Sequence, residues 1–293
     1  MDYTFENESL RCTVHSRGAE LCSVVDRATG AEMMWQADPA VWPRTAPVLF
    51  PYCGRLKDGK YVWKDVTYEG GQHGFARDLE HSLETSTPDS LTFCLEANAL
   101  TMEKFPFPFK LRTAFVLAGR TLRQTITVVN DGDEEMPFGL GFHPGFACPF
   151  DAQHSVSDYA VVFDVPETPT VIETGEKTGL CTGRERVYFE RGTEIPLSDT
   201  LFDRDSICFS RLTGKTISLV EKPTGRRVTV ETGAFPYVLL WSAPGPLRFL
   251  CIEPWHTLPD PETASGRWAD KRPAITLVPG SEWSTELKVE FAR

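Results

Sequence analysis

The amino-acid sequence predicts an all-β protein: one large, mostly antiparallel β-sandwich with few short helices. Three observations support this fold class. Many segments alternate apolar and polar residues with a period of two, turn dipeptides separate them, and no window carries a sustained 3.6-residue apolar stripe. The 22 glycines and 22 prolines leave little room for long helices. Neither a fixed-period repeat nor a low-complexity linker divides the chain, so we expect one domain over residues 1–293.

The alternating segments run from one end of the chain to the other. They are Leu10–His15, Lys60–Lys64, Ser90–Leu95, Leu122–Val129, Arg227–Val230 and Ser284–Phe291. Turn signals separate them, at Thr29-Gly30, Asp58-Gly59, Gly70-Gly71, Asn130-Asp131-Gly132, Thr213-Gly214, Thr224-Gly225 and Pro279-Gly280. We expect one short helical turn at Asp38–Trp42.

Composition restricts the classes of partner. A hydrophobic content of 41% with 24% charged residues is typical of a globular protein with a substantial core. The net charge of −11 and the lack of any Lys/Arg-rich run argue against nucleic acid and membrane surfaces as partners. No apolar run approaches the ~20 residues of a membrane helix, and the amino terminus lacks the features of a signal peptide. We therefore expect a cytoplasmic protein without a nucleic-acid or membrane partner.

The eight cysteines do not form a metal-binding or redox pattern. None is arranged as C-x-x-C, and most lie in apolar, strand-like runs. Free cysteine behaves as a small buried hydrophobe, and a cytoplasmic protein keeps its thiols reduced. We expect reduced core cysteines and no metal, because the clustered Cys/His spacing of a zinc site is absent.

The most informative residue is Glu253, which follows the apolar run Phe249–Ile252. Buried glutamate is rare unless it is paired or used. An apolar site raises the pKa of a carboxyl group and nearby donors lower it, so such a group can be tuned for proton transfer. The alternative is a glutamate on an edge strand that points to solvent.

Three further segments place polar groups in unusual surroundings. An apolar run beginning at Pro47 leads to Arg55, whose guanidinium is suited to ligand hydroxyls or an oxyanion. His73 lies among glycines, and His143 lies in an aromatic, glycine-rich segment where an imidazole can act as a general acid. The alternatives are a surface arginine, a turn residue and a satisfied core histidine, respectively.

In combination these segments resemble the aldose 1-epimerase (galactose mutarotase-like) family, in particular its shorter, divergent bacterial branch. The resemblance rests on four motifs in sequence order: Gly54-Arg55-Leu56, His73-Gly74-Phe75, Phe142-His143-Pro144 and Ile252-Glu253-Pro254. It covers nearly the whole chain and implies the large mutarotase-like β-sandwich. It also implies interconversion of the α and β anomers of an aldose, without a metal or organic cofactor.

The resemblance further implies roles for individual residues. Glu253 would be the general base at the C1 hydroxyl, and His143 the general acid at the ring oxygen. His73 and Arg55 would bind hydroxyl groups and stabilise charge on the ring oxygen. An acidic residue that binds sugar hydroxyls would correspond to Asp205 in preference to Asp203, because Asp205 directly precedes the apolar run Ile207–Phe209.

Trp241 and Trp255 are candidate stacking surfaces for a pyranose, with ordinary core packing as the alternative. The sequence departs from better-known mutarotases in Pro144-Gly145, after the second histidine, and in Trp255-His256, after the glutamate. Both departures touch the pocket that the resemblance implies, so the identity of the sugar does not transfer.

Three other functions remain open. A hexose-6-phosphate 1-epimerase would need additional cations for the phosphate, for which Arg77 and Arg44 are candidates. A non-catalytic sugar-binding or sensor protein would keep the pocket without turnover. A glycoside hydrolase would need two carboxylates, which Glu253 and Asp205 could supply. In each case the expected partner is a small-molecule sugar, and the sequence leaves monomer and homodimer equally open.

Overall fold

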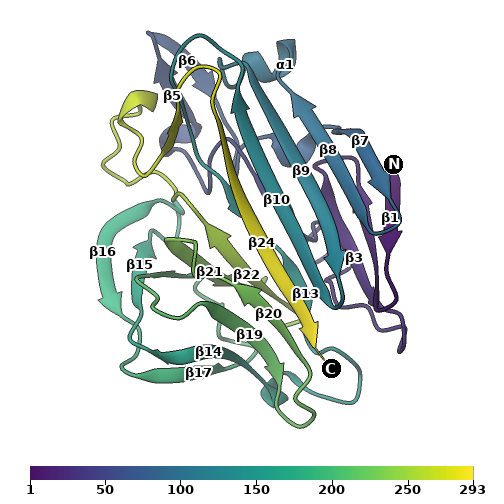
Figure 1. The fold of residues 1–293 in the computed structure, drawn as a ribbon. Coiled ribbons are helices and arrows are strands. Elements are labelled where there is room, and N and C mark those ends of the chain that lie inside the picture. The colour runs from purple at the N-terminus through teal and green to yellow at the C-terminus, as the bar shows by residue number, and fades with distance from the viewer. Residues whose placement is uncertain (293) are drawn as a thin grey trace.

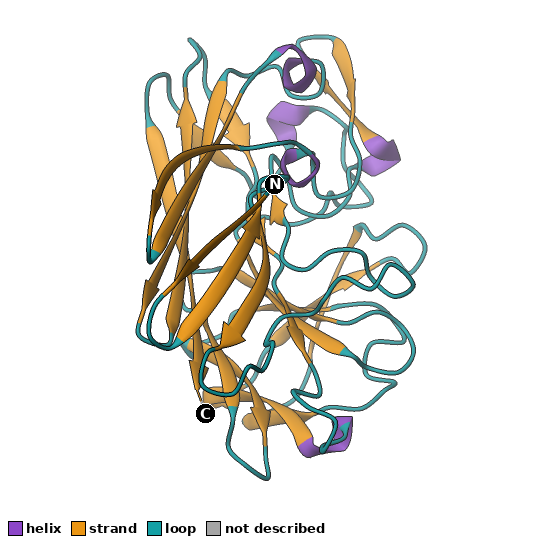
Figure 2. Cartoon of the chain, turned by 90° about the vertical axis from the view of Figure 1, so that its right-hand side faces the viewer, coloured by secondary structure: helices purple, strands orange, loops and turns teal. Residues whose placement is uncertain are grey.

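The computed structural model describes residues 1–292, which are folded mainly as antiparallel β-sheets (Figure 1). Within this part of the chain the helices are short and lie at the periphery of the sheets (Figure 2). They are α1 (Ala99–Met102), η1 (Lys57–Gly59), η2 (Ala76–Asp78), η3 (Val156–Asp158) and η4 (Trp268–Asp270). The prediction of an all-β fold with few short helices is confirmed.

The larger sheet has nine strands in the order β17-β14-β19-β20-β24-β10-β9-β8-β7. Figure 1 shows its long central strands β9, β10 and β24 side by side. The bounds are β7 (Ser82–Thr87), β8 (Ser90–Glu96), β9 (Phe109–Ala118), β10 (Thr121–Asn130), β14 (Tyr159–Glu167), β17 (Gly192–Pro196), β19 (Thr216–Glu221), β20 (Arg227–Glu231) and β24 (Glu282–Ala292).

The second sheet has eight strands in the order β16-β15-β18-β21-β22-β12-β4, with β13 also paired to β22. Its strands are β4 (Val48–Leu49), β12 (Gly141–Phe142), β13 (Gly145–Ala147), β15 (Thr170–Thr174), β16 (Cys181–Val187), β18 (Ile207–Ser210), β21 (Tyr237–Trp241) and β22 (Phe249–Trp255). Smaller sheets contain β1 (Asp2–Glu6), β2 (Leu10–His15) and β3 (Glu20–Asp26), then β5 (Lys60–Trp63) and β6 (Val66–Glu69), then β11 (Met136–Phe138) and β23 (Ile275–Leu277).

The strands predicted from alternation are all present, with ends that differ by no more than two residues. The expected helical turn at Asp38–Trp42 is a hydrogen-bonded turn and not a helix. In it, the backbone N–H groups of Val41 and Trp42 both donate to the carbonyl oxygen of Asp38. Pro39 follows the first residue of this turn and Pro43 follows its last, and the residue before a proline is biased away from helical geometry.

A core of apolar side chains joins the two large sheets. Along β10 the residues alternate between buried and less buried, so one face of the nine-stranded sheet is covered. Aromatic rings meet across the sheets: Phe146 on β13 contacts Phe291 on β24, with ring centroids 6.3 Å apart. Phe209 on β18 likewise contacts Phe163 on β14 at 6.0 Å. The eight cysteines are free thiols, and seven of them are buried, as expected from the sequence.

Strand β22 is buried on both of its faces. Leu250 and Ile252 point into the core between the sheets, whereas Phe249 and Cys251 pack in a separate apolar cluster on the opposite face. Successive side chains of a strand point to opposite faces, so Glu253 lies on the same face as Cys251. The run Phe249–Ile252 is continuously apolar because both faces of the strand are buried. The next residue, Glu253, places its carboxyl group on the outer face of the eight-stranded sheet.

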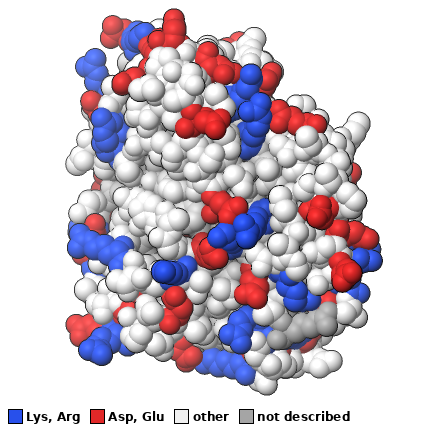
Figure 3. Space-filling model, in the orientation of Figure 1, with Lys and Arg blue, Asp and Glu red and all other residues white. Residues whose placement is uncertain are grey.

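Charged side chains are spread over the surface. On the face drawn in Figure 3, acidic and basic residues are interspersed and separated by uncharged atoms. Among the described residues, none of the helices combines the length and apolar character needed to span a bilayer.

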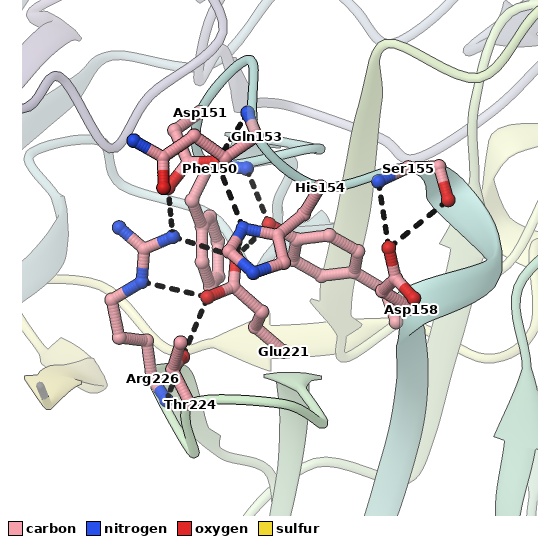
Figure 4. Close-up of polar contacts among 10 residues, drawn as sticks. Phe150, Asp151, Gln153, His154, Ser155, Asp158, Glu221, Thr224 and Arg226 are labelled. Atoms are coloured by element: carbon pink, nitrogen blue, oxygen red, sulfur yellow. Dashed lines mark hydrogen bonds and ion pairs between the residues drawn. The ribbon is translucent and has the colours of Figure 1, made fainter.

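A cluster of polar side chains connects the β19–β20 hairpin to the loop that follows β13 (Figure 4). The guanidinium of Arg226 binds both carboxylate oxygens of Glu221, from Nε at 2.9 Å and from Nη2 at 2.7 Å, and also binds Asp151. Tyr159 donates its hydroxyl to Glu221, whose side chain is fully buried. Burial raises the pKa of Glu221, but the donors from Arg226, Thr224 and Tyr159 outweigh it and hold the pKa below its usual value.

Removing this arginine tests the structural role of the cluster. We expect Arg226→Met to lower the free energy of unfolding by about 3 kcal/mol, because the buried Glu221 carboxylate loses its arginine partner and keeps only Tyr159, Thr224 and His154. The matched control is Lys222→Met, which breaks a half-exposed pair with Glu194 and should cost less than about 1 kcal/mol. Urea unfolding at neutral pH measures both values.

The pH dependence has a definite sign. The folded-state pKa of Glu221 lies below its unfolded value, so the stabilisation is present at pH 7 and is lost as the pH falls below the ordinary glutamate value of about 4.3. Equal stability losses in Arg226→Met and Lys222→Met would contradict the assignment.

Candidate active site

A pocket of about 320 Å³ opens on the outer face of the eight-stranded sheet. Adjacent strands supply its floor, because Cys208 on β18 pairs with Leu239 on β21, which pairs with Glu253 on β22. Loops that precede the strands or connect them supply its walls. All seven site residues proposed from the sequence line this one pocket: Arg55, His73, His143, Asp205, Trp241, Glu253 and Trp255.

Glu253 is 1% exposed, so the alternative of a solvent-facing edge glutamate is excluded. Its Oε2 atom lies 3.3 Å from Nε2 of His143, and no other polar group of residues 1–292 is within hydrogen-bonding distance of that oxygen. Burial raises the pKa of Glu253 well above its ordinary value, and the negative charge of Asp205 raises it further. The carboxyl group is therefore held in a state that favours its protonated form.

His143 lies at the end of β12, where β12 pairs with both β4 and β22. Its side chain is 9% exposed. Burial is the main cause that lowers the pKa of His143 to about 3, and the charge of Arg77 lowers it further. The imidazole of His143 is therefore a much weaker base than that of an exposed histidine.

The opposite shifts define the resting state of the pair. The carboxyl group has a raised pKa and the imidazole a lowered pKa, and the two groups lie 3.3 Å apart. Both shifts favour the uncharged forms, in which the proton of the pair is on Glu253. Moving the proton to His143 creates an ion pair of a strong base and a strong acid, which is the form that proton-transfer chemistry requires.

His73 is held as a neutral hydrogen-bond donor. Its Nδ1 atom accepts the backbone N–H of Gly54 at 3.0 Å, so the ring proton lies on Nε2, which faces the pocket beside the Gln72 amide. Burial lowers the pKa of His73 well below its ordinary value, and the charges of His143, Arg77 and Arg55 add to this. His73 adopts a positive φ of 65°. The next residue, Gly74 (φ 71°), must be glycine, because a Cβ there would lie 2.1 Å from the carbonyl oxygen of Phe50.

Arg55 lies at the mouth of the pocket on an anchored loop. Its carbonyl oxygen accepts the backbone N–H of Asp260, and the Asp260 carboxylate accepts the N–H of Lys57 at 3.0 Å. Lys271 completes the anchor with a buried ion pair to Asp260, at 2.6 Å. The side-chain stem of Arg55 lies near Gly179 while the residue as a whole stays exposed. Packing of the Arg55 stem is therefore compatible with ligand binding by its guanidinium, which stays a prediction.

The remaining predicted residues differ in exposure. Asp205 is exposed at the pocket, whereas the described lining does not include Asp203. Trp241 is half-buried and meets the His143 ring edge-on, with centroids 5.6 Å apart. Trp255 is only 3% exposed and donates its indole N–H to the carbonyl oxygen of Phe142 at 3.2 Å. It therefore presents little free surface, and its part in sugar stacking stays a prediction.

Sequence reasoning missed several lining residues. Trp42 stacks on the His143 ring, with centroids 4.9 Å apart and an interplanar angle of 26°. The segment after β15 contributes Glu176 and Lys177, and the loop after β6 contributes Gln72. These residues occupy loops without alternation. The one available signal for Trp42 was a large aromatic residue in a polar, proline-rich loop.

Two groups of three side chains bring possible metal-binding atoms within 4.8 Å of one another. In Asp151, His154 and Glu221, the carboxylates are already bound by Arg226. In His143, Cys251 and Glu253, burial raises the pKa of the Cys251 thiol well above its ordinary value, which opposes the thiolate that a metal needs. Neither group has the character of a metal centre.

The chain is similar to proteins of known sequence and structure over its whole length. It matches the aldose 1-epimerase family over residues 1–290. It is 31% identical to protein LacX (chromosomal) of Lactococcus lactis subsp. lactis over 285 residues, which is 95% of each chain.

Two solved structures share the fold closely. A galactose mutarotase related enzyme from Lactobacillus acidophilus has a TM-score of 0.95 and 35% identity, covering 100% of this chain and 98% of its own. A galactose mutarotase-like protein from Lactobacillus casei has a TM-score of 0.91 and 31% identity, with 99% of each chain covered.

The electrostatics of the pocket can be tested without a substrate. We expect the imidazole signals of His143 and His73 to remain those of the neutral ring from about pH 8 down to about pH 5, because burial lowers both pKa values. NMR titration of ring-labelled protein measures this, with the urea-unfolded chain as the reference. A midpoint for His143 near the ordinary value of about 6.5 would show that the site is hydrated and not dry.

Proposed function

Because the chain belongs to the aldose 1-epimerase family, we propose that it interconverts the α and β anomers of an aldose by opening and reclosing the sugar ring. The observation that carries the proposal is the buried pair of Glu253 and His143, 3.3 Å apart in the floor of the pocket. An acid and a base side by side suit a reaction in which one proton leaves the C1 hydroxyl while another reaches the ring oxygen.

The proposed cycle uses the one proton that the pair holds. When a sugar binds, the proton moves from Glu253 to His143 and the carboxylate then accepts the C1 hydroxyl proton. His143 donates to the ring oxygen, the C1–O5 bond breaks, and an open-chain aldehyde forms. Rotation about C1–C2 presents the other face of the carbonyl, and reclosure reverses both proton transfers. Atoms, charges and protons balance, so no cofactor is consumed.

The pKa shifts favour ring opening. Burial makes the Glu253 carboxylate a stronger base than an exposed glutamate and makes the His143 imidazolium a stronger acid than an exposed histidine. After ring opening, Glu253 is again protonated and His143 again neutral, the uncharged arrangement that the buried site favours. Before ring opening, the neutral pair must become an ion pair, and this step costs free energy. Contacts with the bound sugar must compensate for that cost.

The surrounding groups suit a polyhydroxylated ligand. The neutral His73 offers Nε2–H as a donor to a sugar oxygen, Arg55 offers a guanidinium, and Asp205 offers acceptors for hydroxyl groups. Trp241 supplies an apolar surface beside His143. In this arrangement Glu253 and His143 are the catalytic residues, and the others bind and orient the sugar.

A phosphorylated aldose is the second candidate substrate. Arg55, Arg77 and Lys177 all line the pocket, which gives three cations near the acidic residues. Arg77 has a buried Nε without a hydrogen-bond partner among the described residues. Arg44, the other cation that the sequence offered, is engaged by Glu20 and Asp78 and does not line the described pocket. Besides Arg55, the cations that could bind a phosphate group in this pocket are therefore Arg77 and Lys177.

Substitution of the catalytic pair tests the proposal. We expect Glu253→Gln and His143→Asn each to lower kcat by about 10²- to 10⁴-fold, because each removes one proton-transfer group. The assay is polarimetry of freshly dissolved aldoses and aldose 6-phosphates, corrected for the rate in buffer. Asp205→Asn should raise KM, whereas the control Asp203→Asn, outside the pocket lining, should behave as the wild type.

The outcomes separate the competing functions. If the wild type equilibrates no aldose faster than buffer, the epimerase proposal fails. Sugar binding without equilibration would indicate a sensor. Faster turnover of the 6-phosphates, abolished by Arg77→Met, would identify the phosphorylated substrate.

A further inference from the structure

We propose that Trp42 is a positioning residue for His143: its indole fixes the plane of the imidazole so that Nε2 stays directed at Glu253 and the pocket. The catalytic consequence of this inference rests on the proposed function, but the stacking itself does not.

The polar contact that links the His143 ring to another side chain is its approach to Glu253. Nε2 faces Glu253 at 3.3 Å, whereas Nδ1 is buried and has no hydrogen-bond partner on another of the described residues. Catalytic histidines are generally oriented by a hydrogen bond to the second ring nitrogen. No other described residue supplies that partner, and the one hydrogen bond that affects the pKa of His143 is with its own backbone. Packing must therefore supply much of the orientation of this ring.

The packing is a column of aromatic rings that ends on the imidazole. Trp35 stacks on Phe249 with centroids 4.8 Å apart, Phe249 on Trp42 at 5.2 Å, and Trp42 on His143 at 4.9 Å. The interplanar angles are 30°, 17° and 26°, so each ring is stacked on the next. Trp241 meets both Trp42 and His143 edge-on. Trp42 thus covers one face of the imidazole, and rotation of the ring would push against it.

The loop that carries Trp42 is fixed independently of the pocket. Trp35 donates its indole N–H to the carbonyl oxygen of Trp42 at 2.9 Å. The carboxylate of Glu20, 7% exposed, accepts the backbone N–H groups of Thr45 at 2.6 Å and Ala46 at 3.0 Å. Arg44 adds a contact to the same carboxylate. Anchors on both sides of Trp42 make its position part of the fold, which is the requirement for preorganising a catalytic group.

Gly145 makes this approach possible. A Cβ at Gly145 would lie 2.8 Å from Cζ3 of Trp42, which is closer than real contacts allow. The Gly145 backbone also ties the two segments together, because its N–H donates to Thr45 and its carbonyl oxygen accepts from Trp35. In the Pro144-Gly145 segment, where the sequence departs from better-known mutarotases, the glycine therefore leaves the space that Trp42 occupies beside His143.

The indole also restricts water at the imidazole. The groups with ionisable side chains that face His143 come from three elements: Glu253 and Cys251 on β22, His73 in the loop after β6, and Arg77 on η2. Asp205 acts through Glu253. Trp42→Leu keeps all of these ionisable side chains and removes only the indole ring that stacks on His143. Changes in His143 can then be assigned to the indole.

The experiment compares Trp42→Leu, Trp42→Phe and Gly145→Ala with the wild type. We expect Trp42→Leu to lower kcat by about 10- to 100-fold, because the imidazole loses its fixed orientation, while KM changes by less than about threefold. Trp42→Phe, which keeps a ring, should recover most of the loss. Gly145→Ala, which displaces the indole, should lower kcat in the same direction as Trp42→Leu. The matched control is Trp63→Leu, a half-buried tryptophan packed on Phe107 away from the pocket, which should leave kcat unchanged.

NMR of the His143 ring supplies a readout that needs no turnover. In Trp42→Leu the ring-current shift of the imidazole protons should disappear, and the pKa of His143 should rise by about one unit as water reaches the exposed face. Unchanged kcat together with unchanged His143 signals would overturn the inference, and so would an effect on KM alone. If the wild type proves inactive, the proposed function fails, and the NMR comparison still decides whether Trp42 holds the imidazole.

Discussion

The active site depends on the burial of one carboxyl group on a strand that is covered on both faces. Strand β22 directs Leu250 and Ile252 into the core between the sheets and directs Glu253 to the outer face. Loops and aromatic residues of the pocket cover that face, so the carboxyl group is only 1% exposed, with Nε2 of His143 3.3 Å from its Oε2 atom. Desolvation then shifts the two pKa values in opposite directions.

Much of the remaining structure supports this constraint. Asp260 and Lys271 anchor the loop of Arg55, and Gly54 fixes the tautomer of His73. Glu20 anchors the loop of Trp42, whose indole covers the imidazole. Each of these anchors is a buried polar group bound by backbone or by a charged partner, which is the condition under which buried polar groups stabilise a structure instead of destabilising it. The pocket is thus assembled from anchored loops on the eight-stranded sheet.

Alternation of apolar and polar residues predicted the strands. The site residues were easiest to predict where a polar or charged residue interrupts an apolar or glycine-rich run. Glu253 stands out because a carboxylate interrupts an apolar run, and the four ordered motifs identified Arg55, His73 and His143. Alternation could not show that β22 has two buried faces, because a strand covered on both sides reads as a continuous apolar run. Trp42 could not be predicted, because its position depends on Glu20, 25 residues before Thr45, and on Gly145 much later in the chain. The same holds for Arg226, whose partner Asp151 is 75 residues away.

The protonation state of Glu253 without a bound sugar decides whether the buried pair is neutral at rest. Infrared difference spectroscopy between the wild type and Glu253→Gln at neutral pH, in H₂O and D₂O, reports whether this carboxyl group is protonated. We expect a carbonyl band of a protonated carboxyl group that shifts in D₂O and is absent from the variant. A carboxylate band in its place would mean that Glu253 is ionised at rest, and would contradict the neutral pair on which the proposed mechanism depends.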